Sequence, residues 1–262
     1  MKISLSALDK NHFGVVTAKA SFETNDSLGD TLCWCHENKV EFLIARIPTE
    51  NISLAQELEL TGFILTDTLV YFRHENISDT EIGLTESCPP IGTENNEMKG
   101  YSWRLAVPTD AEDIKQLAKK IFKNYPGHYY ADRRLKKSDC DLVYSSWAVN
   151  SCLDKDFSDV FFLFIFEEKP VGFLTIKVIE TDTGEIMLNG IHPDFQGKGL
   201  YFSLISLAKK WAIQQRLRQL IVSTQVTNLA VQKVWCRQGF EPYKSYYTFH
   251  RWFTNGFTND PI

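Results

Sequence analysis

The stretch that decides the fold is His192-Pro193-Asp194-Phe195-Gln196-Gly197-Lys198-Gly199-Leu200, which we expect to connect a strand to a helix. Its two glycines can take positive φ angles, so several backbone N–H groups can turn toward one point. The start of the helix adds a partial positive charge, and together these features form a cradle for an anion such as pyrophosphate. A Gly-x-Gly loop also occurs in ordinary tight turns, so the loop alone leaves both interpretations open.

The segments around this loop predict a mixed α/β domain. A strand over Glu185–Ile191 precedes the loop, and apolar residues at helical spacing predict a helix over 200–215. Upstream, Asp159–Phe166 and Val171–Ile179 are aromatic and β-branched runs separated by turn residues, as in a β-hairpin. Downstream, Leu217–Thr224 predicts a further strand.

The middle of the chain contains the start of this domain. Tyr101–Val107 predicts a strand and Ala111–Phe122 an amphipathic helix, and we expect Asn124–Ala131 to be a loop. Between residues 75 and 100 the sequence is acidic, rich in turn-forming residues and without a sustained period. This composition is typical of a linker.

The two halves of the chain contain an internal echo. Asn51–Phe63 (NISLAQELELTGF) has the same length as Asn228–Phe240 (NLAVQKVWCRQGF), and both begin with Asn and end with Gly-Phe. Each copy follows an apolar run and precedes an aromatic one, which favours two related α/β units over a chance match. The predicted domains are a truncated first unit over 1–74, a linker over 75–100, a complete second unit over 101–253 and a flexible tail over 254–262.

Composition excludes several classes of protein. Of 262 residues, 44% are hydrophobic and 23% charged, which is typical of a soluble globular protein, and the net charge of -5 argues against a broad nucleic-acid-binding face. No apolar run approaches the roughly 20 residues that span a bilayer, and the first residues lack the apolar segment of a secretory signal. A cytoplasmic location is therefore expected, with no membrane partner. The scattered cysteines and histidines show no metal-ligand spacing, so no metal is expected.

The loop and its surroundings together resemble the GNAT acetyltransferase superfamily. Gln196-x-x-Gly199 follows a strand, and a helix, a strand, Asn228 and Gly239-Phe240 come after it. The resemblance covers Tyr101–Phe253. It implies an α/β fold with a mixed sheet and two GNAT-like units in tandem, the first truncated or degenerate and the second complete. It also implies an N-acyltransferase that uses acyl-coenzyme A as cosubstrate.

The resemblance assigns roles to individual residues. The amides of Gly197–Tyr201 match those that hold the coenzyme A pyrophosphate, and the strand Asn189–Ile191 matches the one that pairs with pantetheine. Asn228 matches the residue that contacts the cofactor's arm. One position departs from the pattern, because Tyr201 stands where the loop motif has a small residue; either the loop is wider or the ring points away from the cofactor. The implied cofactor-binding residues are Asn189, Gly190, Ile191, Gln196, Gly197, Lys198, Gly199, Leu200, Tyr201 and Asn228.

A closer likeness concerns most of the chain. Leu8–Gly14, Thr61–Phe63 and Tyr144–Ser151 together look like the bacterial dTDP-fucosamine acetyltransferases, which join a truncated GNAT-like half to a complete one. This likeness implies transfer of an acetyl or short hydroxyacyl group to the amine of a nucleotide-linked deoxysugar, for cell-surface glycans such as O-antigen lipopolysaccharide. The alternatives are a GNAT enzyme for a peptide, polyamine or aminoglycoside amine, and a non-catalytic module that binds coenzyme A or a nucleotide. Homodimer formation is left open.

Candidates for the base and the oxyanion donor lie on the strand before the loop. Gly190 either marks a bulge that turns the Ile191 N–H toward the thioester carbonyl or allows close packing. Glu185 resembles the glutamate base of GNAT histone acetyltransferases, while a strand-end glutamate is more often solvated. His128 and His192 are rival bases, and an amino sugar can also lose its proton to water or backbone.

The sequence offers more than one source of the proton for the departing thiolate. The superfamily commonly has a tyrosine on the helix after Asn228, but the matching residue here is Trp235, whose indole cannot serve as the acid. Tyr246, Tyr247 or solvent would substitute, and we take Tyr247 as the candidate. Alternatively the thiolate leaves unassisted, since a thiol pKa of about 8.5 makes it a tolerable leaving group.

The acceptor is expected to bind between the halves, under the loop Asn124–Arg134. Aromatic rings in this loop could stack on a base or sugar, and its arginines could pair with a diphosphate. A basic and aromatic loop is also common on plain protein surfaces. The candidate acceptor-binding residues are Tyr125, His128, Tyr129, Arg133 and Arg134.

Overall fold

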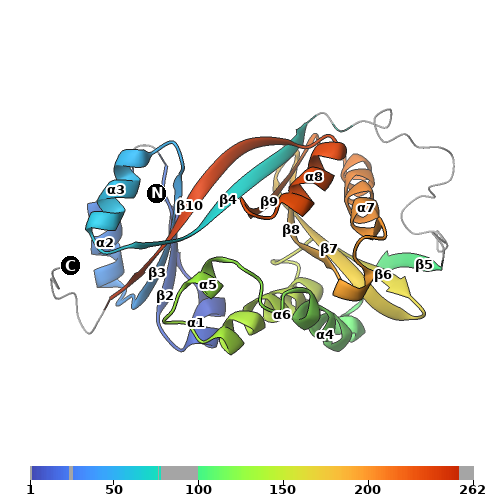
Figure 1. The fold of residues 1–262 in the computed structure, drawn as a ribbon, viewed down its shortest axis with the longest axis horizontal. Helices are drawn as coiled ribbons and strands as arrows, with labels where there is room; N and C mark the ends of the chain where they lie inside the picture. The colour runs from blue at the N-terminus through green and yellow to red at the C-terminus, as the bar shows by residue number, and fades with distance from the viewer. Residues whose placement is uncertain (1, 24–25, 76, 78–99, 254–262) are drawn as a thin grey trace. The chain divides into compact units, whose positions relative to one another are not determined.

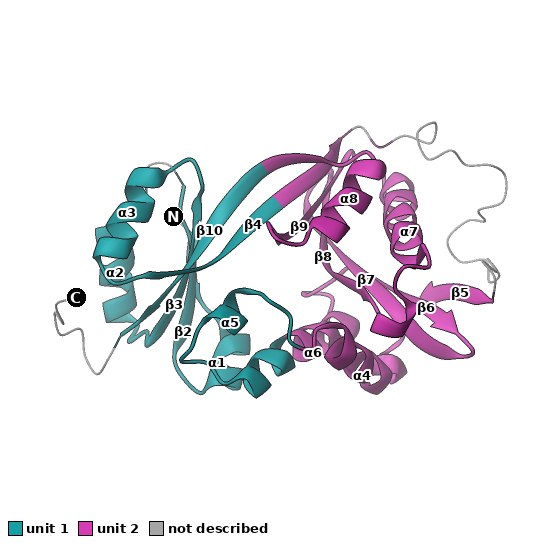
Figure 2. Ribbon diagram, in the orientation of Figure 1, with its two compact units in different colours: residues 1–70, 124–143, 244–262 teal, residues 71–123, 144–243 magenta. Residues whose placement is uncertain are grey.

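The computed structural model describes residues 2–23, 26–75, 77 and 100–253. They form two compact units, each built from separate segments of the chain (Figure 2). Unit 1 takes residues 1–70, 124–143 and 244–262, and unit 2 takes residues 71–123 and 144–243. Residues 124–143 and 244–253 thus belong to unit 1, although we expected a second domain that runs from 101 to 253. The predicted tail and all but residues 75, 77 and 100 of the predicted linker lie outside the described residues.

Unit 1 is an α/β unit with the strand order β1-β2-β3-β10-β4 (Figure 1). β2 and β3 are parallel. β1 pairs antiparallel with β2, and β10 pairs antiparallel with β3. Its core packs Leu28 and Cys35 of α2 and Leu54 and Leu58 of α3 with strand residues such as Phe249. Its elements are β1 Lys2–Leu5, α1 Ala7–Phe13, β2 Thr17–Ser21, α2 Leu28–Glu37, β3 Phe42–Pro48, α3 Ile52–Leu60, α5 His128–Ala131, the start of α6 Lys137–Leu153, and parts of β4 Ile64–Glu75 and β10 Glu241–Trp252.

Unit 2 has the strand order β4-β9-β8-β7-β6-β5, with β8 and β9 parallel and the β5-β6-β7-β8 meander antiparallel. Glu167 and Glu168 turn the β6–β7 hairpin with φ angles of 47° and 63°. α7 buries an apolar stripe that includes Leu204 and Ala208. Its further elements are β5 Tyr101–Leu105, η1 Pro108–Asp110, α4 Ala111–Ile121, the rest of α6, β6 Val160–Phe166, β7 Lys169–Glu180, β8 Thr183–Ile191, η2 Pro193–Phe195, α7 Leu200–Gln214, β9 Gln219–Gln225 and α8 Leu229–Arg237.

The internal echo is a structural duplication. β3, α3 and β4 have the same lengths and spacings as β9, α8 and β10, each second-copy residue number being 177 higher, as in 51 and 228. Both helices end the same way: Gly62 and Gly239 have φ angles of 83° and 84°. The following N–H groups, of Phe63 and Phe240, reach back 3.0 Å to the carbonyls of Leu58 and Trp235. These are glycine-dependent helix stops of the same design. The predicted tandem α/β architecture is confirmed.

The last strand of each copy contributes to the other copy's unit. β10 follows α8 of unit 2, yet its residues 246–252 pair antiparallel with β3 in unit 1. β4 follows α3 of unit 1, and its residues 71–75 belong to unit 2, where the strand order places β4 next to β9. Each unit is therefore completed by a strand from the other copy.

Candidate active site

The glycine loop enters α7 in unit 2 as the sequence predicts. Gly197 and Gly199 have φ angles of 73° and 82°, and Gly199 is the residue that precedes the first turn of α7. A Cβ atom at either position would meet nothing within 4 Å. The glycines are therefore required for the left-handed backbone and not for space within the protein.

Two side chains hold the loop in shape. The amide nitrogen of Gln196 donates to the carbonyl of Ile191, 3.1 Å away, and ties the loop to the end of β8. Lys198 donates to the carbonyl of Asp194 at 3.1 Å, with its ammonium over the Phe195 ring. In this structure both side chains turn back onto the loop, so they support its backbone.

The first turn of α7 completes the cradle. At a helix start the first N–H groups have no carbonyl partner within the helix, and the helix dipole adds positive potential there. Leu200 is 1% exposed, so only its backbone can meet a ligand. An uninterrupted helix, Leu200–Gln214, stands behind this turn.

β8 and β9 diverge toward the loop. Their parallel pairing runs from Thr183 and Gln219 to Ile186 and Val222, whereas β8 continues to Ile191 and β9 to Gln225. The part of β8 beyond the pairing, residues 189–191, is here called the open edge. Because a strand edge without a partner exposes N–H and C=O groups, it can pair with an extended ligand that carries amides.

The N–H groups on the open edge follow from the pairing with β7. The N–H of His192 donates to the carbonyl of Val171 at 2.8 Å. Successive N–H groups of a strand point to opposite edges, so the N–H of Ile191, and likewise that of Asn189, points away from β7. The carbonyl of Ile191 accepts from Gln196. The open edge thus offers two N–H donors, from Asn189 and Ile191.

Of the two roles expected for Gly190, a bulge or close packing, the structure shows close packing. Gly190 pairs regularly with Phe173, and the extra residue is Met187, between the Thr175–Leu188 and Ile176–Ile186 pairs. A Cβ on Gly190 would lie 2.5 Å from Cγ2 of Ile121 on α4. The glycine therefore serves close packing, and the Ile191 N–H reaches the open edge through ordinary strand alternation.

Tyr201 points inward from α7. Its hydroxyl donates to Oδ1 of Asn189 at 2.7 Å and accepts from the indole N–H of Trp235 on α8 at 3.0 Å. Tyr201 and Trp235, the two residues that depart from the expected pattern, thus form a hydrogen bond with each other. Asn228 precedes α8 and donates to the hydroxyl of Thr224 near the end of β9, 3.0 Å away.

The other two candidate catalytic residues lie elsewhere. Glu185 is half-buried in the stretch of β8 that pairs with both neighbours, opposite Lys177 and Ile221. Tyr247 belongs to unit 1, where it pairs with Ile47 and packs against the core of that unit. Their assignment as base and acid stays a prediction.

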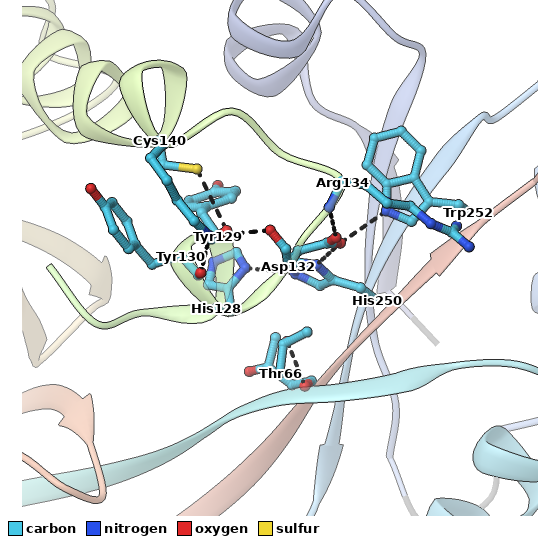
Figure 3. A network of polar contacts seen from close by, with 11 residues as sticks. Thr66, His128, Tyr129, Tyr130, Asp132, Arg134, Cys140, His250 and Trp252 are labelled. Atoms are coloured by element: carbon cyan, nitrogen blue, oxygen red, sulfur yellow. Dashed lines mark hydrogen bonds and ion pairs between the residues drawn. The ribbon is translucent and has the colours of Figure 1, made fainter. Parts of the chain in front are cut away.

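The segment expected to be a loop over Asn124–Ala131 contains the one-turn helix α5, His128–Ala131. It leads into a buried network in unit 1 (Figure 3). Nδ1 of His250 lies 2.8 Å from Asp132 Oδ2, and its Nε2 lies 2.9 Å from Nδ1 of His128. The indole N–H of Trp252 donates to the same carboxylate oxygen at 2.9 Å.

The carboxylate sets the tautomers of this histidine relay, His128–His250–Asp132. Asp132 accepts only, so His250 carries its proton on Nδ1 and presents Nε2 as an acceptor. His128 then carries its proton on Nδ1, which leaves a lone pair on Nε2. Burial lowers the pKa of both histidines, so both are neutral. Burial alone would raise the pKa of Asp132, but hydrogen bonds from His250 and Trp252 lower it to about 2.

A second buried group adjoins the relay. The hydroxyl of Tyr129 donates to Asp9 Oδ1 at 2.5 Å, and Lys19 pairs with Asp9 Oδ2 at 2.7 Å. The structure thus brings two predicted acceptor residues, His128 and Tyr129, into one polar cluster. Sequence reasoning missed Asp9, Asp132, His250 and Trp252, because no local spacing connects residues so far apart in the chain.

The side chains of the other residues predicted to bind the acceptor substrate are more exposed than those of His128 and Tyr129. Arg133 and Arg134 are exposed, and the Arg134 guanidinium lies over the Trp252 ring, 5.9 Å from its centroid. Tyr125 is half-buried, and its carbonyl accepts from the N–H of Gly127.

Among the described residues no helix is long and apolar enough to cross a bilayer, and no group of three or more His, Cys, Asp or Glu side chains is arranged for a metal.

Comparisons with known proteins find similarities for the segment that contains the glycine loop. Residues 115–240 match the acetyltransferase (GNAT) family. The chain is 22% identical over 217 residues to the spore coat polysaccharide biosynthesis protein SpsD of Bacillus subtilis (strain 168), covering 82% of this chain and 68% of that protein. A GCN5-related N-acetyltransferase from Sphaerobacter thermophilus matches the fold with a TM-score of 0.61, at 12% identity, over 95% of this chain and 76% of that one. A tandem GNAT protein from the clavulanic acid biosynthesis pathway matches with a TM-score of 0.56, at 12% identity, over 91% and 76%. Residues 115–240, which include the glycine loop, are therefore similar to the GNAT family of acetyltransferases.

Proposed function

We propose that this protein transfers an acetyl or short hydroxyacyl group from coenzyme A to the amine of a nucleotide-linked amino-deoxysugar. The observation that supports binding of coenzyme A, the acyl donor, is the open edge of β8, which ends at the glycine loop and the first turn of α7. An amide-pairing edge that leads to an anion cradle fits pantetheine followed by pyrophosphate.

The donor contacts follow from this arrangement. The backbone of Gly197–Tyr201 would hold the pyrophosphate, with Gln196 and Lys198 supporting the loop. Asn189 and Ile191 would pair with the arm, and their N–H groups are the candidates that receive the thioester oxygen as it gains negative charge. Asn228, fixed to Thr224, would contact the arm from the β9 side.

The choice of a sugar nucleotide as the acceptor rests on one relative and on residues of unit 1. SpsD is named for polysaccharide biosynthesis, which favours a sugar amine and a role in cell-surface glycans. In unit 1, the buried side chains of His128 and Tyr129 are bonded to His250 and Asp9, and they fix the start of the segment that carries Arg133 and Arg134. The exposed guanidinium groups of Arg133 and Arg134 suit a diphosphate.

In the reaction, a neutral amine attacks the thioester carbon, a C–N bond forms and the C–S bond breaks. The amine loses one proton and the thiolate gains one, so the step balances without another reactant. A sugar amine is partly neutral near pH 8, so we propose that its proton passes to solvent and not to Glu185.

The test is thiol release from acetyl-coenzyme A with separate panels of dTDP-linked amino sugars, peptides, polyamines and aminoglycosides. We expect turnover with the sugar nucleotides, and a structure soaked with coenzyme A and dTDP should show both bound. Turnover restricted to another panel would overturn the sugar assignment.

A second candidate function is non-catalytic binding of coenzyme A or a nucleotide. It is favoured by the two departures from the family pattern, Tyr201 and Trp235, at the cofactor-binding end of unit 2. Coenzyme A binding in calorimetry without thiol release for any amine would establish it.

A further inference from the structure

The hydroxyl of Tyr201 occupies a defined position in unit 2. An indole N–H only donates, so the bond from Trp235 uses a lone pair of the phenol oxygen. The phenol proton is directed to Oδ1 of Asn189. The hydroxyl is thus held from two sides, by α8 and by β8.

The support behind this hydroxyl is rigid. Trp235 is 1% exposed, and its ring packs edge-on against Phe72, with 5.4 Å between the centroids. A tryptophan fixed by core packing cannot follow a mobile partner, so the indole N–H fixes where the Tyr201 oxygen lies.

The hydroxyl also lies beside the open edge. Asn189, which accepts its proton, is a residue whose N–H points to that edge, and the next such N–H belongs to Ile191. If these N–H groups hold the carbonyl oxygen of a thioester, the sulfur lies beside them, because it is bonded directly to the carbonyl carbon. The phenol of Tyr201 is then an O–H donor close to the leaving group.

We propose that Tyr201 is the proton donor to the departing coenzyme A thiolate, with Trp235 and Asn189 as positioning residues. The inference rests on the proposed acyl transfer. As the C–S bond breaks, the phenol proton moves to the sulfur and gives the free thiol. The phenolate regains a proton from solvent, which has received the one lost by the amine, so the cycle closes.

The first test compares Tyr201→Phe with wild type, using Tyr101→Phe on β5 as the matched control. We expect Tyr201→Phe to lower kcat on the order of 10²-fold, the usual scale for a general acid, while calorimetry gives an unchanged Kd for coenzyme A. The wild-type rate should fall at high pH as the phenol ionises, and this limb should vanish in Tyr201→Phe. The control should keep the wild-type rate and profile.

The second test moves the hydroxyl from α7 to α8. Because the Trp235 indole nitrogen lies 3.0 Å from the Tyr201 oxygen, a tyrosine at 235 can bring its own hydroxyl into this region. We expect Tyr201→Ala and Trp235→Phe each to lower kcat, and the double variant Tyr201→Ala with Trp235→Tyr to recover most of it. A purely structural role for Tyr201 predicts no such recovery.

The outcomes separate the inference from the proposed function. If the wild type turns over and Tyr201→Phe has the same kcat and pH profile, the role assigned to Tyr201 is wrong, while the proposed acyl transfer stands. A wild-type protein that releases no thiol with any amine overturns the acyl transfer and this inference together.

Discussion

Acidification should destabilise unit 1 through the histidine relay. His128 and His250 are almost fully buried and neutral, and burial is the largest cause of their lowered pKa values. The nearby charges of Arg46 and Lys19 lower the pKa of His128 further, whereas Asp132 partly offsets the effect of burial on His250. The folded protein therefore resists the protonation that the unfolded chain accepts.

The sign and size of the effect follow from linkage. An unfolded histidine titrates with a pKa of about 6.5, so below that pH the unfolded state binds more protons and the free energy of unfolding falls. Lowering the pH from 7.5 to 5.5 costs about 1.4 kcal/mol for a histidine that stays neutral in the fold, and this is the upper limit for each of the two. Asp132, with a pKa of about 2, stays ionised across this window.

The assay is urea unfolding of the full chain at pH 7.5 and pH 5.5, compared with His128→Asn. Asparagine keeps a donor for His250 but does not titrate. The variant should lose less stability on acidification than wild type, by up to about 1.4 kcal/mol. Equal losses in the two proteins would refute the reasoning, because His128 would then titrate alike in the folded and unfolded states.

Four further outcomes are expected. Gly199→Val forces a β-branched residue to a φ of 82° and should weaken coenzyme A binding about tenfold or more in calorimetry; unchanged affinity in a folded variant would place the cradle elsewhere. Gly190→Ala puts a methyl group 2.5 Å from Ile121 and should lower the free energy of unfolding by about 1–3 kcal/mol in urea; no loss would show that α4 yields easily. Glu185→Gln should change the rate little at pH 8; a drop of about 10²-fold, together with loss of the fall in wild-type rate at low pH, would make Glu185 the base. Calorimetry should give one coenzyme A per chain, since the segment between β2 and α2 has no glycine; two equivalent sites would contradict this.

The sequence predicted the elements whose signals are local. The helix over 200–215 was clear because its apolar stripe repeats at helical spacing, and α7 ends within one residue of the expected place. The duplicated helix–strand units were found from Asn and Gly-Phe at matching positions. Asn51 and Asn228 precede the two helices, and Gly62 and Gly239 end them with positive φ angles, so the glycines report backbone geometry directly.

What the sequence could not predict depends on distant segments. A glycine inside a strand signals either a bulge or close packing, and only the presence of Ile121 from α4 decides for packing at Gly190. The histidine relay joins residues from α5 and β10 that lie more than a hundred positions apart. α5 itself has a single turn, too short for a periodic pattern to mark it.

The exchange of β4 and β10 has a consequence for how the protein is made. In the strand order of unit 1, β10 lies between β3 and β4, and among the described strands it is synthesised after all the others. The first unit to be synthesised therefore cannot close its sheet until residue 252 has emerged. N-terminal domains usually fold early during synthesis, but here both halves must wait and complete folding together, with long-range pairing as the slow step.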